Sequence, residues 1–242
     1  VVEEDFISRL IDVAQSGSKV GAVQPKILSK DDSRKIDSLG QQISPVGGAR
    51  DLGFGEIDKF VRPREVFGAC AAAALYKADM LNEVGLFDAS FFVIFEDVDL
   101  SWRIKLSGYH SLLVPDARVY HLRGISGPTA LRKTDQLMKR YYTARNQLCL
   151  LIRYYPLRTF LQFLPIHAYN FLRLLFYSSR IRDKRLLSDL VRFARERVIF
   201  QRLPLMRKIH KEWLSRNQAK DVYSHYARKI ISRIQRRSNG EI

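Results

Sequence analysis

Three carboxylates gather within four residues of the sequence. Glu96, Asp97 and Asp99 follow the apolar run Phe91–Phe95 and open a helical pattern that extends to about Ser107. A carboxylate becomes a usable general base when burial and nearby like charges raise its proton affinity. Asp97 and Asp99 lie about 200° apart around such a helix, so they cannot face one cleft. Acids are also favoured in a first helical turn by the helix dipole alone, so the pattern by itself leaves both interpretations open.

Alternating strand and helix patterns surround these acids and predict an α/β layer. A helix is expected around Phe6–Ala14, followed by a short buried strand at 20–28 that a Pro-containing turn ends. Residues 29–65 are polar and rich in turn residues, which predicts a long loop, either a binding lid or a plain surface excursion. Further along, the pattern predicts a strand at 67–76, a helix at 77–84, a buried strand at 91–95, and strands at 110–114 and 117–121 separated by a Pro115-Asp116 turn.

Composition places the chain among ordinary globular proteins. It has 242 residues, of which 46% are hydrophobic and 27% charged, and this excludes wholesale disorder and a small disulfide scaffold. Cys70 and Cys149 are far apart and outside any Cys-x-x-Cys pattern, which argues against a zinc module and favours a reducing compartment. No basic segment followed by an apolar one opens the chain, so secretion is not expected.

Charge divides the chain into two parts. Residues 1–130 carry 15 Lys and Arg against 18 Asp and Glu, a net −3, whereas residues 131–242 carry 26 against 7, a net +19. A part this basic is expected to face an anionic partner, either nucleic acid or an anionic lipid surface. We therefore expect a boundary near residue 130.

The stretch from Gly68 to Gly127 resembles the C-terminal half of family 2 glycosyltransferases, in their rhamnosyltransferase-like branch. The matching blocks keep the family's order and spacing. They are Gly68-Ala69-Cys70, Val84-Gly85-Leu86-Phe87-Asp88, Phe91-Phe92, Glu96-Asp97-Val98-Asp99-Leu100-Ser101-Trp102-Arg103, Gly108-Tyr109, Val114-Pro115-Asp116-Ala117 and His121.

The resemblance implies the C-terminal half of a GT-A (Rossmann-like) domain and inverting transfer from a nucleotide-sugar. In this reading Asp97 matches the family's general base, which removes the proton of the acceptor hydroxyl. Glu96 and Asp99 match flanking positions that support the site or contact the acceptor. The same supporting or acceptor-binding role is expected for Arg103, Gly68 and Ala69.

His121 matches a histidine that ligates a divalent cation, Mn or Mg, in some members of the family. A lone histidine on a strand is otherwise more often a core residue. The family's nucleotide-binding half and its Asp-x-Asp metal motif are expected to precede Val1, so the chain is interpreted as a fragment of the complete enzyme.

The basic part, 131–242, is predicted to be helical. Tyr141–Asn146 resembles a block that follows the catalytic domain in the same branch. The uncharged run Thr159–Leu172 has 14 residues, which is too short to span a bilayer and favours an amphipathic helix in the membrane plane. Pro156 and Pro165 are expected to break or kink it. Basic residues beside apolar ones recur at 186–200 and 222–234.

The sequence thus predicts a transferase at the cytoplasmic face of the cell membrane, acting on a glycan or lipid-linked glycan in surface polysaccharide synthesis. A helical hairpin that merely packs on the catalytic part is the alternative for the basic region. The alternatives for the whole chain are a non-catalytic scaffold and a module that binds membranes or nucleic acid. Neither a zinc finger nor an RRM-type aromatic motif is present, so nucleic acid is not the expected partner.

Overall fold

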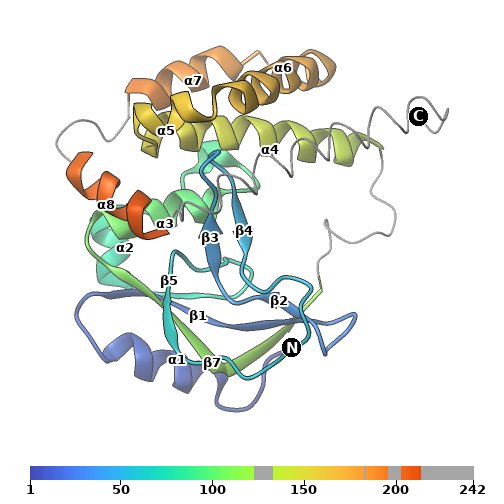
Figure 1. The fold of residues 1–242 in the computed structure, drawn as a ribbon. Helices are drawn as coiled ribbons and strands as arrows, with labels where there is room; N and C mark the ends of the chain where they lie inside the picture. Colours follow the sequence, from blue (N-terminus) through green and yellow to red (C-terminus); the bar gives the residue numbers. More distant parts are fainter. Residues whose placement is uncertain (123–132, 183, 196–202, 214–242) are drawn as a thin grey trace.

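The computed structural model describes residues 1–122, 133–182, 184–195 and 203–213 (Figure 1). It shows a mixed α/β protein, with a five-stranded mixed sheet followed by a helical C-terminal region. The strands are β1 (Val20–Ser29), β2 (Ile36–Ser38), β3 (Gln41–Ile43), β4 (Ala49–Asp51), β5 (Arg64–Val66), β6 (Leu75–Tyr76) and β7 (His110–His121). The helices are α1 (Phe6–Gln15), α2 (Ala78–Val84), the 3₁₀ turn η1 (Ala89–Phe91), α3 (Glu96–Leu106), α4 (Lys133–Tyr154), α5 (Leu157–Gln162), α6 (Leu164–Ile181), α7 (Leu186–Arg195) and α8 (Leu203–Trp213).

Two long parallel strands, β1 and β7, form the centre of the sheet. The strand order is β2-β1-β7-β5, β6 also pairs with β1, and the three short strands are all antiparallel to their neighbours. The β3–β4 hairpin is separate and rises from the sheet toward α4 (Figure 1).

The register between β1 and β7 shifts after Pro25, which faces Val114, so that the next residue of β1 faces Arg118. Pro25 therefore lies inside β1, and the prediction that a Pro-containing turn ends this strand was wrong. The two strands predicted around Pro115-Asp116 are likewise one strand. A β-bulge accommodates both prolines at this register shift, because proline has no backbone N–H to donate to the neighbouring strand.

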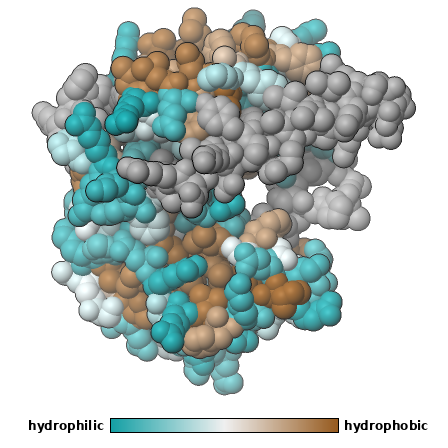
Figure 2. Space-filling model, viewed as in Figure 1, coloured by the Kyte–Doolittle hydropathy of each residue, from teal (hydrophilic) through white to brown (hydrophobic). Residues whose placement is uncertain are grey.

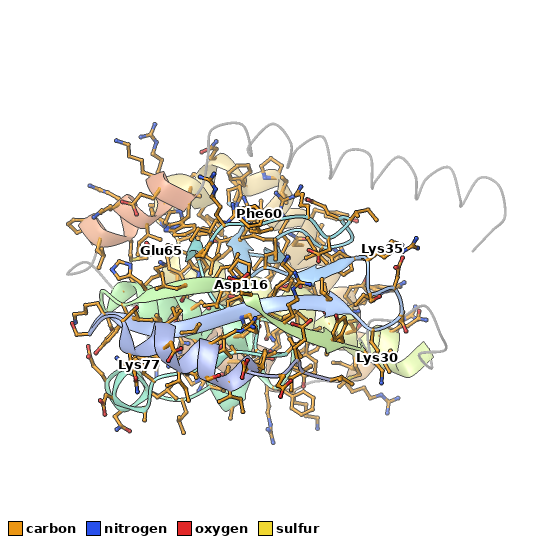
Figure 3. All side chains as sticks on the ribbon, turned by 90° about the horizontal axis from the view of Figure 1, so that it is seen from below. Lys30, Lys35, Phe60, Glu65, Lys77 and Asp116 are labelled. Atoms are coloured by element: carbon orange, nitrogen blue, oxygen red, sulfur yellow. The ribbon has the colours of Figure 1, made fainter. Side chains whose placement is uncertain are left out.

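Helices cover both faces of the sheet. Leu10 and Ala14 of α1 pack against Val23 on the lower face, where α1 lies across β1 and β7 (Figures 1 and 3). The neighbouring strand residue, Ala22, points the other way and packs against Leu100 of α3, because side chains alternate along a strand. The predicted amphipathic helix and the buried strand after it are confirmed.

Glycine lies at the ends of two further helices. α2 stops at Gly85 and α3 stops before Gly108, whose φ angles are 84° and 79°. Positive φ costs glycine little, so both positions suit the end of a helix.

Three strand or loop predictions were wrong. Residues 29–65 contain β2, β3, β4 and part of β5, strands of three residues that are too short to alternate visibly. Of the strand predicted at 67–76, only Leu75–Tyr76 lies in the sheet, as β6, because residues 67–74 turn toward α3. The apolar run at 91–95 ends η1 and continues as a loop, not as a strand.

The C-terminal helices form a layer above the sheet (Figure 1). They do not stand apart, because Tyr154 of α4 and Met206 and Ile209 of α8 share one core with Phe67 and Trp102. α6 and α7 pack in turn on α4 through Tyr141, Leu174 and Leu186, among other residues.

The described part of the basic region is helical, as predicted. Pro156 caps α5 and Pro165 lies in the first turn of α6, so the two prolines mark helix starts, and the apolar segment is broken as expected. Within the described residues, no helix combines the length and apolarity needed to cross a membrane. The segment 222–234 lies outside the described residues.

Candidate active site

The first turn of α3 separates its acids, as the helical angle predicts. Asp97 is partly exposed, whereas the side chain of Asp99 is 0% exposed and points into the protein. Of the roles expected for Asp99, acceptor contact does not fit a side chain that no solute can reach. The two carboxylates therefore belong to different environments.

Asp97 lies in surroundings that favour its protonated form. Burial raises its pKa to about 7, and the charges of Glu96 and Asp51 add to this effect. The backbone N–H of Ala71 donates to Asp97 Oδ2 at 3.1 Å, and this bond together with the N–H of Val98 lowers the pKa only in part. A base with a pKa near the ambient pH combines a populated charged form with a strong drive to take a proton.

Two further acids, Glu96 and Asp51, act on Asp97 through their charge. Glu96 Oε2 is buried and has no hydrogen-bond partner within the described residues. Asp51, at the end of β4, accepts a hydrogen bond from Ser38 Oγ at 2.9 Å. The negative charges of Glu96 and Asp51 raise the proton affinity of Asp97.

A tight turn between β5 and β6 supplies the amide that meets Asp97. Gly68 O accepts from the backbone N–H of Gln41 at 2.8 Å, and Cys70 N–H donates to Gln24 Oε1 at 2.6 Å. A Cβ at Gly68 would lie 1.9 Å from Ser101 Oγ, so only glycine lets the turn approach α3 this closely. Ala69 is fully buried against α3 and β1. Gly68 and Ala69 therefore support the wall of the site by packing.

The loop that leads into α3 is strained. Phe92, Ile94 and Phe95 have φ angles of 59°, 68° and 71°, a region that bulky and β-branched residues rarely occupy. The buried side-chain amide of Asn146, in α4, donates to the carbonyl oxygens of Phe91, Val93 and Ile94 at 2.9, 2.9 and 2.7 Å. Its two hydrogens are shared among three acceptors. Helix α4 thereby fixes the loop that presents Asp97.

Asp99 is the centre of an ion-pair network between α3 and α4. It accepts from Arg103 Nε at 2.9 Å, from Arg153 at 2.6 Å and from the Tyr154 hydroxyl at 2.7 Å. Arg153 also pairs with Asp88 at 3.2 Å. Asp99 supports the site by holding these two helices together.

Arg103 closes the end of α2 as well. Its guanidinium donates to the carbonyl oxygens of Val84, Gly85 and Leu86 at 2.7–2.9 Å. These are the unsatisfied carbonyls that a helix C-terminus leaves. The supporting role expected for Arg103 therefore has a specific geometry, in which its two terminal nitrogens donate to backbone carbonyls.

A cavity of about 490 Å³ is lined in part by Asp51, one of the acids whose charge acts on Asp97. It lies along the β3–β4 hairpin and the turn after it, and its lining includes Gln42, Arg50, Asp51 and Phe54. Asp51 is close enough to Asp97 for its charge to raise the pKa of that carboxyl. Asp97 itself does not line this cavity, and Asp51 is the residue that links the two.

His121 is held away from this junction by the strand that carries it. It pairs with Ser29 at the far end of β1, five residues beyond Gln24, or about 16 Å along the strand. Its Nδ1 lies 2.8 Å from Asp37 Oδ2, the arrangement that orients many metal-binding imidazoles. Within the described residues, however, no three His, Cys, Asp or Glu side chains gather where they could hold a metal ion. The role of His121 as a cation ligand therefore stays a prediction, and no step below depends on it.

Sequence reasoning found the base candidate and missed most of what surrounds it. Asp51 and the Ala71 amide come from residues 46 and 26 positions before Asp97, and no local pattern marks them. Asn146 did have a signal, because it lies in the Tyr141–Asn146 block. Its buried amide shows why that block is needed near α3.

No protein-family model matches the chain, and no curated protein matches it. The function is therefore inferred from the geometry around Asp97 and from the sequence blocks between Gly68 and His121.

Proposed function

We propose that this chain carries the acceptor side and the general base of an inverting glycosyltransferase with a GT-A fold. The enzyme moves a sugar from a nucleotide-sugar to a glycan, such as a lipid-linked glycan of a surface polysaccharide. The observation that carries the proposal is Asp97, a partly exposed carboxyl with a pKa of about 7 at the start of α3. The blocks from Gly68 to His121 supply the reaction class.

Asp97 acts on the acceptor in a single displacement. An acceptor hydroxyl donates its hydrogen bond to the carboxylate and loses its proton to it as the oxygen attacks the anomeric carbon. The new C–O bond forms on the face opposite the leaving group, and the bond to the diphosphate oxygen breaks with its electron pair. The products are an inverted glycoside, a nucleoside diphosphate and a protonated Asp97, which returns its proton to solvent.

Neighbouring groups prepare Asp97 for this step. Ala71 N–H fixes one carboxylate oxygen, and the Asn146-bound loop fixes the start of the helix. Glu96 and Asp51 raise the proton affinity of Asp97 without themselves needing to reach the acceptor. Hydrogen bonds thus fix the position of Asp97 and neighbouring charges set its proton affinity, as is typical of a catalytic base held by rigid elements.

The test is transfer by the full-length protein, measured as acceptor-dependent release of nucleoside diphosphate from a panel of nucleotide-sugars. Asp97→Asn is expected to lower turnover by about 10²–10⁴-fold, because the base is lost while the Ala71 hydrogen bond can persist. Asp116→Asn is the matched control, since Asp116 is exposed on β7 (Figure 3) and far along the chain from the acidic turn. Unchanged turnover in Asp97→Asn contradicts the proposal.

The same proposal includes an anionic membrane surface as a partner. Large apolar side chains are exposed along α5, α6 and α7, and Figure 2 shows apolar surface over α6 and α7 at the top of the molecule. They are Leu157, Leu161, Leu164, Phe171, Leu172, Leu175, Phe176, Leu187 and Val191. Exposed basic residues stand beside them, among them Arg158, Arg180 and Lys184. Apolar contact flanked by cations suits an anionic leaflet, where each nearby cation contributes about 1 kcal/mol.

Vesicle flotation of the whole chain tests this partner. The pair Leu172→Ser with Phe176→Ser should lower binding to vesicles of phosphatidylglycerol and phosphatidylcholine at least tenfold, because two membrane contacts are lost. The matched pair Ile7→Ser with Leu86→Ser removes exposed apolar side chains elsewhere and should bind normally. Equal binding by both pairs contradicts the assignment of the surface.

A further inference from the structure

The cavity beside the β3–β4 hairpin has no part in the proton transfer that we assign to Asp97. Its volume of about 490 Å³ lies within the range of about 300–1,000 Å³ that is typical of small-molecule sites. Its lining combines side chains that form hydrogen bonds with one aromatic ring. These side chains belong to Gln42, Arg50, Asp51, Phe54 and Glu56. Such a lining suits a ligand that is polar at its edge and apolar on one face.

A guanidinium and an amide form part of the cavity wall. Gln42 of β3 and Arg50 of β4 face each other in the hairpin register, and Arg50 Nε and Nη2 donate to Gln42 Oε1 at 3.1 and 3.0 Å. These bonds hold the guanidinium in one orientation. They use two of its five N–H donors and neither donor of the glutamine amide. The wall therefore presents fixed donors to a ligand that carries oxygen atoms.

The cavity also contains carboxylate acceptors, and its charges are mixed in sign. Glu56 is exposed, and its Oε2 accepts from Lys59 Nζ at 3.0 Å. A carboxylate has about four lone-pair positions, so Glu56 can accept from a ligand while it pairs with Lys59. Arg50, Asp51 and Glu56 bring both signs of charge into the lining. Mixed donors and acceptors suit hydroxyl groups, because each hydroxyl donates and accepts, better than they suit an ion of one sign.

Phe54 supplies the apolar face of the cavity. Its side chain is 59% exposed although it belongs to a polar lining. The glycines on both sides of it, Gly53 and Gly55, have φ angles of 72° and 78°, in the left-handed region that favours glycine. A Cβ at Gly53 would also lie 3.1 Å from side-chain atoms of Ile36 and Leu39. This turn places a large ring at the surface beside polar groups, where it can contact the apolar C–H face of a sugar ring.

The hairpin that carries the cavity is bound to the helix that carries Asp97. Gln41 precedes Gln42 and points to the opposite face of β3, where its Oε1 accepts from Ser101 Oγ of α3 at 2.8 Å. Ser101 Oγ also lies 2.7 Å from the carbonyl oxygen of Asp97. Asp51, which lines the cavity, pairs with Gln41 across the hairpin. A ligand in the cavity is therefore held at a fixed position relative to the base.

We propose that this cavity binds an uncharged pyranose unit of the acceptor glycan, next to the unit that reacts. The apolar face of the ring lies on Phe54. Its hydroxyls bond to the side chains of Gln42, Arg50 and Glu56. The assignment to the acceptor rests on the proposed glycosyl transfer, and it places a non-reacting unit here because Asp97 does not line the cavity. Sugar binding in the cavity does not depend on that transfer.

A titration followed by saturation-transfer NMR on the whole chain tests the cavity, with the methyl glycosides of glucose, galactose, mannose and rhamnose as probes. Phe54→Ala should weaken the bound glycoside about three- to tenfold, because the contact with the ring is lost. Phe60→Ala is the matched control and should bind normally. It removes a phenylalanine that is 83% exposed and lies outside the cavity lining (Figure 3).

Ionic strength distinguishes an uncharged ligand from an ion. The affinity for the glycoside should stay within about twofold when salt is raised, because screening acts on charges. Equal effects of the two phenylalanine variants, binding that is lost at high salt, or no saturation transfer to any of the four glycosides overturns the proposal.

Transfer kinetics separate this proposal from the proposed function. Phe54→Ala should raise the KM for the acceptor and leave kcat nearly unchanged, because the cavity holds a unit that does not react. Glycoside binding that depends on Phe54, without transfer from any nucleotide-sugar, counts against the proposed function alone. Transfer that depends on Asp97 but has the parent's acceptor KM in Phe54→Ala counts against the sugar site alone.

Discussion

Asp97 and Asp99, on two sides of the first turn of α3, lie in opposite electrostatic surroundings. On the side of the β5–β6 turn, Asp97 meets two acids and two backbone amides. On the side of α4, Asp99 meets two arginines and a tyrosine hydroxyl. Asp99 is paired with two arginines and joins helices, whereas burial and the charges of neighbouring acids raise the pKa of Asp97 to about 7.

Helix α4 contributes to both sides in different ways. Arg153 and Tyr154 supply the partners of Asp99 directly, whereas Asn146 reaches the Asp97 side only through the backbone of the loop. The strongly basic region therefore begins with a helix that completes the α/β part. The membrane contact that we propose would use α5–α7, which are farther from the sheet (Figure 1).

The largest expected effect is at Asp99. Asp99→Asn should lower the free energy of unfolding by about 3–5 kcal/mol, because Arg153 and Arg103 are left without their buried counter-charge. Urea denaturation of the whole chain measures this. Asp116→Asn, at an exposed position, should stay within about 0.5 kcal/mol of the parent. A similarly small change at Asp99 would show that the network does not hold the helices.

Asp97→Asn should change stability in the opposite direction. The folded-state pKa of Asp97, about 7, exceeds its ordinary value of 3.8, so the folded chain binds this proton more tightly than the unfolded chain does. The resulting stability is fully present below about pH 4 and is lost as the pH rises through about 7. Asparagine removes this loss. We expect the variant to be more stable than the parent at pH 8, by roughly 2–4 kcal/mol, and to show little gain at pH 4. Denaturation curves at the two pH values measure this, and equal gains at both would rule out the raised pKa.

The sequence predicts the features around Asp97 and Asp99 that depend on helix geometry and on helix-ending residues. The helical angle separates Asp97 from Asp99, and glycines at 85 and 108 end the helices around them. The loop before α3 could not be predicted, because Phe91–Phe95 is an apolar run typical of a strand. Its left-handed residues are stabilised by an amide that lies 52 residues beyond Ile94. Tertiary contacts of this separation override local preference and leave no periodic trace.

Asn146→Leu tests the link between α4 and the Asp97 side. Three carbonyls lose their donor, so the strained loop should relax, and stability should fall by about 1–3 kcal/mol. Hydrogen exchange of the amides of residues 92–97 should rise more than exchange in β1 and β7. Gln136→Leu, an exposed amide on the same helix, serves as the control. Equal exchange in the two variants would mean that packing alone shapes the loop.

The finest test separates the effect of Glu96 from that of burial. Burial is the larger cause of the raised pKa of Asp97, and the charge of Glu96 is the second. Glu96→Gln removes that charge and keeps the shape of the side chain, so the pKa of Asp97 should fall by up to about one unit and remain above 3.8. The pH profile of turnover should shift to lower pH by the same amount, with its plateau nearly unchanged, because Asp97 is then deprotonated at lower pH. Carbon-detected NMR titration of the Asp97 carboxyl gives the same quantity without an activity assay. A profile that stays in place would leave burial as the sole cause of the shift, and a collapsed plateau would make Glu96 a participant in the reaction itself.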